Sequence, residues 1–335
     1  MSTTAPVAGT SPRVSVVMTC YNEGPFIGAA VRSVTDQTRA DLVDKIVIAD
    51  DGSAPETIAV LRELEAADRR VEVLYGTGGN GISRQRNLAI ARTSTPFVAI
   101  LDGDDLWTPD KIETELPLIE ADPQVGLVYS DFYLFADGDL SSAHLAKALD
   151  ITGAADLAKA YFQVDPPIVP STTILRRAVL DEVGGFDPSV KVFEDTDLFN
   201  RLARVCRFAF TPKPLLYKRV RRSSITGSNR DLMAQHAFVA FRAAAADPRL
   251  MPLVPARLAE RASKLANSRF LTGDYEEAVA LARLALRLDP LSLRSWLSRV
   301  ATAPVMRPIV GRMASVAGRR KALGVQDPAG GGSGR

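Results

Sequence analysis

Apolar and polar positions follow two alternating periods along the first part of the chain. Short β-branched runs predict buried strands, and the segments between them carry apolar residues at helical spacing. Alternating strands and helices of this kind indicate βαβ units. We therefore expect an α/β fold with a mainly parallel sheet flanked by helices on both faces. The predicted strands are 14–20, 45–50, 71–76, 96–101 and 125–135, and the predicted helices are 24–38, 51–67, 80–93 and 108–122.

Local signals mark where three of these helices begin. Pro25 falls in a first turn, where its missing N–H is tolerated. Ser53 and Glu56 have the spacing of a capping box at the start of the helix over 51–67. The helix over 80–93 is predicted to be entered from a glycine-containing loop.

The chain changes character after about residue 160. A second block covers about 161–228, and beyond Asp231 the sequence is predicted to be helical and rich in Ala, Leu and Arg. Segment 265–290 predicts a helical hairpin with the spacing of one tetratricopeptide repeat, carried by Gly273, Tyr275, Ala278, Ala285 and Pro290. An array needs about three such units to be stable alone, so we expect this one to pack on the main domain. The predicted organisation is a disordered leader over 1–12, a main domain over 13–228, a helical C-terminal region over 229–322 and a flexible tail over 323–335.

Composition limits the classes of function. With 46% hydrophobic and 24% charged residues, the 335-residue chain has the composition of an ordinary soluble protein. Lys and Arg (41) nearly balance Asp and Glu (39), so the overall charge argues neither for nor against a polyanionic partner. We expect no nucleic-acid partner. The two cysteines lack CxxC spacing and are predicted to be reduced and buried, as in a cytoplasmic protein. With two histidines, any metal must be held by oxygens. No apolar run reaches the ~20 residues of a membrane span, and we expect no signal peptide.

Polar clusters follow three of the predicted strands. They are Thr19–Glu23, Asp50–Ser53 and Asp102–Asp105. Ligands bind beyond the carboxyl ends of the strands in sheets of this kind, because loops and helix N-termini converge there. Three clusters at one edge therefore predict a binding site.

Asp102 and Asp104 are separated by one residue at the end of a buried strand. Carboxylates in this arrangement suit Mg²⁺ or Mn²⁺, which prefers carboxylate, phosphate and water oxygens. Taken alone, the motif fits an Asp-Gly turn with solvated side chains equally well. Its position beside the two other clusters favours the metal site.

Asp50 and Asp51 also admit two explanations. Gly52 can make a turn and Ser53 can cap a helix, which is a common strand-to-helix joint. Carboxylates at this edge can instead accept hydrogen bonds from a nucleobase or a ribose. Arg84 and Arg86 lie near the same edge, and each fits either a solvated turn or a contact with diphosphate or base.

Glu194, Asp195 and Asp197 sit around the start of a predicted short helix with a buried apolar face. Acidic residues in a first turn are favoured by the helix dipole, and residue chemistry alone favours this structural explanation. The alternative is a general base, since a hydroxyl nucleophile needs a carboxylate or histidine within reach.

These motifs, in this order, resemble the family 2 glycosyltransferases with the Rossmann-like GT-A fold. The resemblance covers about residues 13–227. It is carried by "VSVVMTCYNEGPFIGAAVRSVTDQT", "IVIADDGSAPET", "GISRQRNLAIA", "FVAILDGDDLWTPDKI", "VGGFDP" and "EDTDLFNRL".

The resemblance implies a role for each matching residue. The pocket for the nucleotide-sugar donor would be lined by Thr19, Tyr21, Glu23, Asp50, Asp51, Arg84, Arg86, Asp102 and Gly103, with the Asp pair on base or ribose and Arg86 facing the nucleotide. Asp104, with Asp102, would bind a divalent cation, Mg²⁺ or Mn²⁺. Asp195, beside Glu194, would be the catalytic base, which overturns the structural explanation above. Some family members carry a histidine after this motif. Here the matching stretch holds Lys218, Arg219, Arg221 and Arg222, which either contact phosphates or form a solvated basic loop; we favour the loop.

The implied reaction is a metal-assisted, inverting displacement of a nucleoside diphosphate by an acceptor hydroxyl. The acceptor would be a glycan, a lipid-linked molecule or another hydroxyl compound, in cell-surface polysaccharide or glycoconjugate assembly. Two rival explanations are a nucleotidyltransferase and a scaffold protein with a degenerate transferase domain. A nucleotidyltransferase would carry a basic, Gly-rich loop after the first strand, which "TCYNEGPF" lacks, and the intact Asp102, Asp104 and Asp195 argue against degeneration.

Segment 291–322 raises a separate question. Between Asp289 and Asp327 there are six arginines, one lysine and no acidic residue, interleaved with apolar residues that include Trp296. Such a stretch can lie on an anionic membrane surface, which would place the protein peripherally at the inner face of the membrane. It can also pack its apolar face on the main domain, and we favour this explanation.

Overall fold

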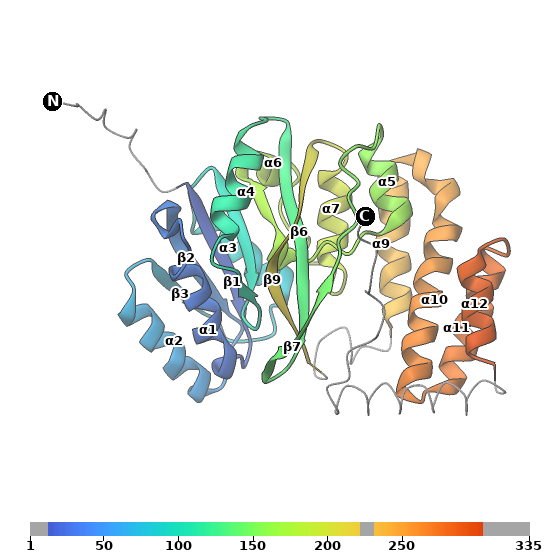
Figure 1. Ribbon diagram of the computed structural model, residues 1–335, viewed down its shortest axis with the longest axis horizontal. Coiled ribbons are helices and arrows are strands. Elements are labelled where there is room, and N and C mark those ends of the chain that lie inside the picture. Colours follow the sequence, from blue (N-terminus) through green and yellow to red (C-terminus); the bar gives the residue numbers. More distant parts are fainter. Residues whose placement is uncertain (1–12, 222–230, 304–335) are drawn as a thin grey trace, which may run out of the picture. The chain divides into compact units, whose positions relative to one another are not determined.

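The computed structural model describes residues 13–221 and 231–303 (Figure 1). The chain divides into two compact units, Met1–Leu250 and Met251–Arg335. The predicted leader over 1–12, the predicted boundary at residue 228 and the predicted tail over 323–335 lie outside the described residues.

A single sheet forms the centre of the first unit. Its order is β3-β2-β1-β4-β8-β6-β9-β5, with β7 paired to β6 (Figure 1). The strands in the described part of the chain are β1 Val14–Cys20, β2 Val43–Asp50, β3 Val71–Tyr75, β4 Phe97–Asp102, β5 Leu106–Trp107, β6 Val125–Ala136, β7 Asp139–Ala146, β8 Ile174–Arg176 and β9 Arg207–Val220.

The first four neighbours, β3-β2-β1-β4, are all parallel, as the alternating pattern predicts. Beyond β4 the sheet is mixed. The short strand β8 pairs antiparallel with both β4 and β6, and β9 runs parallel to β6. The predicted α/β fold is confirmed, and the antiparallel pairings of β5, β7 and β8 are an addition that the sequence pattern did not predict.

Helices connect the strands and cover both faces of the sheet. Residues of β1 alternate between two hydrophobic clusters: Val16 packs with Ile27 and Ile112 on one face, and Val17 packs with Ala89 and Phe199 on the other. Helices on both faces are therefore confirmed. The α-helices of this unit that the structure describes are α1 Gly24–Thr35, α2 Pro55–Ala67, α3 Ile82–Ala91, α4 Lys111–Glu120, α5 Leu157–Val164, α6 Arg177–Glu182, α7 Glu194–Leu202 and α9 Leu232–Ala246, and the 3₁₀ helices are η1 Ala40–Leu42, η2 Pro170–Thr172 and η3 Pro248–Leu253, which extends past the end of the unit.

The start of α2 differs from the predicted capping box. Ala54 holds the N-cap position and no side chain caps the helix. Ser53 Oγ instead accepts a hydrogen bond from Asn22 N at 2.8 Å, and Asn22 Oδ1 accepts one from Ala54 N at 2.8 Å. The capping box is therefore wrong: Ser53 joins the β2–α2 turn to the loop after β1. Pro25 does lie in the first turn of α1, as predicted.

The second unit contains the helices α10 Val254–Thr272, α11 Tyr275–Leu288 and α12 Leu293–Ala301, which lie side by side (Figure 1). Gly273, with φ +90°, ends α10 and Asp274 caps α11, so a helical hairpin is present where one was predicted. Its assignment as a tetratricopeptide repeat stays a prediction. Among the described residues, no helix is both long and apolar enough to span a membrane. Both cysteines are free; Cys20 is buried as predicted, whereas Cys206 is partly exposed.

Candidate active site

The three polar clusters lie at one edge of the sheet. Thr19, near the end of β1, is in register with Ala49 of β2 and with Asp102 of β4. Cys20 is in register with Asp50. The parallel strands thus deliver all three clusters to neighbouring positions, which is the arrangement that the sequence predicts.

The Asp50 and Asp51 carboxylates hold the loops of this edge together. Asp50 is fully buried and accepts hydrogen bonds from the backbone of Gly52 at 3.0 Å and of Ser53 at 3.2 Å. Asp51 accepts from Gln85 Nε2 at 2.8 Å and from the backbone of Asn80 and Gly81. Burial favours the neutral acid, but these hydrogen bonds hold the pKa of Asp51 below its usual value. Both side chains therefore have structural partners, and their predicted contact with base or ribose stays a prediction.

Gly52 allows the two loops to meet. It has a φ of +78°, which favours glycine, and a Cβ there would lie 2.6 Å from the backbone nitrogen of Gly78. The turn that buries Asp50 therefore requires glycine at this position.

Arg86 is the centre of the site. It is 2% exposed, and its two terminal nitrogens reach Asp102 Oδ1 and Glu194 Oε1, each at 2.7 Å. Helix α3 positions Arg86, β4 ends at Asp102, and α7 begins at Glu194. One guanidinium thus links the Asp102–Asp104 turn to the Glu194-Asp195 segment. Arg84, two residues earlier on α3, is exposed.

The turn after β4 packs against the start of α1. A Cβ at Gly103 would lie 2.9 Å from the backbone oxygen of Thr19 and would meet the Glu23 carboxylate, so only glycine fits. Burial and the nearby charge of Asp104 raise the pKa of Glu23 to about 8. Burial and Asp102 likewise raise the pKa of Asp104. Tyr21, also predicted to line the pocket, is 63% exposed at the same edge.

The end of β9 brings cations to this turn. Arg221 Nη2 lies 2.6 Å from Asp104 Oδ2 and 2.9 Å from Glu23 Oε1. Arg219 donates from its side chain to the backbone oxygen of Asp104 at 2.9 Å, and Lys218 Nζ lies 3.8 Å from Asp105. The solvated basic loop that we favoured from the sequence is therefore wrong for these three residues, which are counter-ions of the acidic turn. Arg222 lies outside the described residues.

Asp105 is a buried anchor of the turn. It accepts a hydrogen bond from Ser171 Oγ at 2.7 Å and one from the backbone of Arg219 at 2.9 Å. Burial raises its pKa to about 6. Ser171 also accepts a hydrogen bond from the backbone of Asp102 at 3.1 Å. Sequence reasoning missed Ser171, because a serine in a Pro-Ser-Thr segment carries no signal of its own.

Glu194, Asp195 and Asp197 have three different environments at the start of α7. Glu194 is paired with Arg86, and burial and the Asp195 charge raise its pKa to about 7. Asp197 is buried between Arg201 at 2.8 Å and Arg242 at 3.3 Å, which is a structural role. Asp195 accepts a hydrogen bond from the backbone of Thr196 at 2.6 Å, and none of the ion pairs found among the described residues involves it. Burial raises its pKa above the usual value for an aspartate.

The acidic side chains at this edge offer carboxylate oxygens, the ligand type that Mg²⁺ and Mn²⁺ prefer. In the part of the chain that the structure describes, no group of three or more His, Cys, Asp or Glu side chains is placed to hold a metal ion. Burial raises the pKa of several of the carboxylates, whereas at Asp102 burial is outweighed by the charges of Arg86 and Lys218 and by hydrogen bonds, which together lower the pKa. Among the described residues, six carboxylates and four cationic side chains gather here. The carboxylates are Glu23, Asp102, Asp104, Asp105, Glu194 and Asp195, and the cations are Arg86, Lys218, Arg219 and Arg221.

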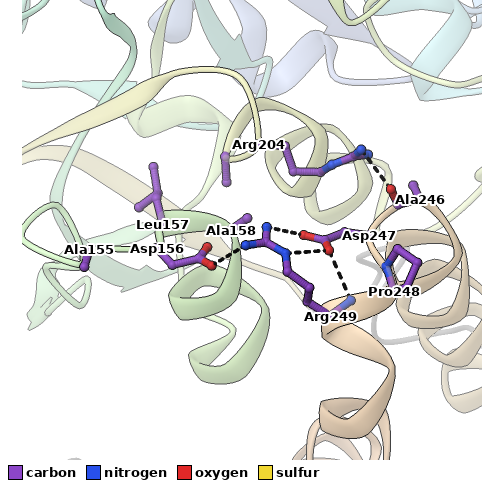
Figure 2. A pocket seen from close by; sticks show the side chains of 10 residues that line it. Ala155, Asp156, Leu157, Ala158, Arg204, Ala246, Asp247, Pro248 and Arg249 are labelled. Atoms are coloured by element: carbon purple, nitrogen blue, oxygen red, sulfur yellow. Dashed lines mark hydrogen bonds and ion pairs between the residues drawn. The ribbon is translucent and has the colours of Figure 1, made fainter.

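A separate cavity of about 540 Å³ lies between α5, the end of α7 and the segment after α9 (Figure 2). Arg249 crosses it to Asp247 at 2.7 Å and to Asp156 at 2.9 Å, and Arg204 donates to the backbone oxygen of Ala246. Its charged groups therefore satisfy one another. None of the candidate site residues lines this cavity.

Solved structures with a similar fold include two nucleotide-sugar complexes. The TarS 1–349 fragment of S. aureus in complex with UDP-GlcNAc aligns with 92% of this chain and 92% of its own length, with a TM-score of 0.61 and 16% identity. The mannosyltransferase PcManGT of Pyrobaculum calidifontis, in complex with GDP-Man and Mn²⁺, aligns with 94% of this chain and 88% of its own, with a TM-score of 0.55 and 17% identity. At these identities the likeness establishes the fold alone, and it confirms the predicted GT-A fold.

Curated relatives match part of the chain. TuaG of Bacillus subtilis, assigned to teichuronic acid biosynthesis, is 37% identical over 105 residues, which are 31% of this chain and 41% of TuaG. The chain spans about half or less of the length of TuaG and of the next curated relatives. The sequence model described as glycosyl transferase family 2 matches residues 15–184, just over half of the chain. The chain therefore belongs to glycosyl transferase family 2.

Proposed function

We propose that the protein transfers a sugar from a nucleoside-diphosphate sugar to an acceptor hydroxyl in a single displacement that inverts the anomeric centre. The observation that carries the proposal is the position of Arg86, which joins Asp102 to Glu194 at the carboxyl edge of the sheet. The proposed donor-binding turn and the acidic first turn of α7 would thereby form one site. Membership of family 2 and the GT-A fold support the same chemistry.

Asp195 is the proposed base. Of the three acidic residues in the first turn of α7, Glu194 is committed to Arg86 and Asp197 to Arg201 and Arg242. The Asp195 carboxylate retains an acceptor oxygen for the proton of the attacking hydroxyl. A raised pKa makes an ionised carboxylate a stronger base, provided that the working pH lies above it.

Asp104 and Asp102 are the proposed ligands of Mg²⁺ or Mn²⁺, with Glu23 next to them. The pairing of Asp104 with Arg221 must open for this, and the freed guanidinium then suits the donor diphosphate. A bound cation would neutralise charge on the leaving diphosphate. Arg86 holds Asp102 in place, and Lys218 adds positive charge to the same edge.

We propose the donor and the acceptor as chemical classes. UDP-GlcNAc and GDP-Man are bound by proteins of similar fold, which supports a nucleoside-diphosphate sugar as donor. The assignment of TuaG supports a role in cell-surface polysaccharide biosynthesis, with a glycan, lipid-linked or other hydroxyl acceptor. The two cysteines, without disulfide-type spacing, support a cytoplasmic location.

The test is donor hydrolysis and transfer with a panel of UDP-, GDP- and dTDP-sugars, with and without Mn²⁺. We expect metal-dependent turnover with at least one donor. Asp195→Asn should lower transfer by roughly 10²–10⁴-fold while donor binding persists, because only the proton acceptor is lost. Asp104→Ala should lose both metal-dependent binding and transfer. Absence of metal-dependent turnover and binding across the panel would reject the proposal in favour of a scaffold role. An active Asp195→Asn would move the base to Glu194, because Asp197 is committed to Arg201 and Arg242.

A further inference from the structure

Helix α12 turns its apolar residues outward. Leu293, Trp296, Leu297 and Val300 are between 55% and 72% exposed, and their spacing places them on one face, here named the α12 apolar face. The side chains that it buries, Ser295 and Ser298, are small and polar, as is the buried Thr302 at its C-cap. A surface helix of a soluble protein normally has the opposite arrangement.

Specific contacts fix this orientation within the second unit. Ser298 Oγ lies 3.2 Å from Asn267 Oδ1 and 3.4 Å from the backbone oxygen of Ser263, both on α10. Arg294 of α12 pairs with Glu260 of α10. Rolling the helix to bury Leu297 would break these contacts, so the exposed face is a consequence of the packing of α12 and not of a loosely held helix.

The charge of the sequence that contains α12 indicates what covers this face. Residues 290–326 contain six arginines and one lysine and no acidic residue. A second copy of the chain, or the residues that follow α12, would bring cationic sequence against cationic sequence. An anionic lipid surface complements both the charge and the apolar face, and tryptophan favours the interface between headgroups and acyl chains.

We propose that α12 docks the protein on a bilayer containing anionic lipids, with the α12 apolar face in the interface and Arg294 and Arg299 near the headgroups. The proposal does not rest on the transferase chemistry. The packing of this segment on the main domain, which we favoured from the sequence, is the alternative and stays a prediction. The proposal concerns a peripheral contact only.

The test uses the full chain and vesicles of phosphatidylcholine with or without phosphatidylglycerol. Flotation should occur with the mixed vesicles and weaken as salt is added. Leu297→Asp should lower the partition coefficient by roughly tenfold or more, because the burial of one leucine side chain is lost. Leu271→Asp is the matched control: Leu271 is 67% exposed on α10 of the same unit, and this change should leave flotation as it is.

Trp296 reports on the face directly. The other tryptophan, Trp107, is 4% exposed, so the difference between the wild type and Trp296→Phe isolates the Trp296 emission. Without vesicles iodide should quench this emission, and mixed vesicles should shift it to the blue and protect it.

Three outcomes would each overturn the proposal: no flotation, equal effects of Leu297→Asp and Leu271→Asp, or protection of Trp296 without vesicles. The last would show that a second copy or the chain after α12 covers the face. Donor hydrolysis measured without vesicles reports on the transferase proposal separately.

Discussion

The Arg86 guanidinium donates to the Asp102 carboxylate at 2.7 Å, from a helix on one side of the site edge to the end of a central strand. Its second arm reaches Glu194 at the same distance. The two carboxylates lie 92 residues apart in the chain and are joined by a single side chain that is almost fully buried. A lysine at this position would present a compact ammonium group, which lacks the planar set of donors that lets arginine hold both carboxylates.

Arg86→Lys should therefore lower kcat of transfer by roughly 10²–10³-fold, comparable to the loss of one preorganised electrostatic contact. Arg86→Met should also destabilise the fold, by up to about 3 kcal/mol. This value is the lower end of the range for breaking a buried ion pair, and we expect it because Asp102 is partly exposed. Steady-state kinetics and urea denaturation measure the two effects. The control is Arg62→Lys at an exposed position of α2, and an equal loss in that variant would contradict the central role of Arg86.

Arg221 should compete with the metal in the absence of donor. It pairs with Asp104 and Glu23, so Arg221→Met should bind Mn²⁺ more tightly in the donor-free protein, as calorimetry would show. The same variant should raise the donor KM by about tenfold, since a hydrogen bond to a charged group is worth roughly 1.5–3 kcal/mol. Arg221→Lys keeps the charge and serves as the control. Unchanged metal binding in Arg221→Met would show that the pair with Asp104 does not oppose the cation.

The first half of the sheet could be predicted because its signals are local. β1, β2 and β4 are six to eight residues long and mostly apolar, and each is followed by a polar turn. β8 spans three residues and β5 two, which is too short for a periodic signal. Their antiparallel pairing depends on contacts between distant segments, and no pattern along the chain encodes it.

The acidic half of the site could be predicted for the same reason, and its counter-ions could not. Asp50 and Asp102 end parallel strands, so topology alone brings them to one edge. Arg221 lies 198 residues from Glu23, and a basic segment in a sequence does not name its partner. Residue chemistry also could not separate Asp195 from Asp197. The structure does so by burying Asp197 between two arginines.

Asp165 should tune the pH dependence of the reaction. Burial raises the pKa of Asp195, and the charges of Asp165 and Asp102 add to this while Thr196 and Arg86 oppose it. A base acts when ionised, so kcat/KM should rise with pH through the raised pKa and then level off. Asp165→Asn removes a negative charge and retains a residue type that tolerates the left-handed φ of 48°. The acid limb should therefore move to lower pH.

A pH–rate profile of Asp165→Asn distinguishes the two candidate bases. Asp165 is among the groups that raise the pKa of Asp195, whereas the pKa of Glu194, about 7, is raised by burial, Asp195 and Asp102. A limb near pH 7 that Asp165→Asn leaves in place would point to Glu194. A limb that moves would support Asp195.

The buried pair of Lys111 and Glu115 on α4 should show opposite outcomes for single and double substitution. Both side chains are 0% exposed, and Lys111 also donates to the backbone oxygen of Thr172 at 2.9 Å, beside Ser171. Lys111→Met leaves Glu115 buried without a counter-charge and should lower the free energy of unfolding by about 3–5 kcal/mol. Adding Glu115→Leu removes the orphaned charge, so the double variant should recover most of that stability.

The control is Lys45→Met in the more exposed pair with Glu72, which should change stability by less than about 1 kcal/mol. Urea denaturation measures all three, and a double variant as unstable as Lys111→Met would show that the hydrogen bond to Thr172, and not the ion pair, sets the cost.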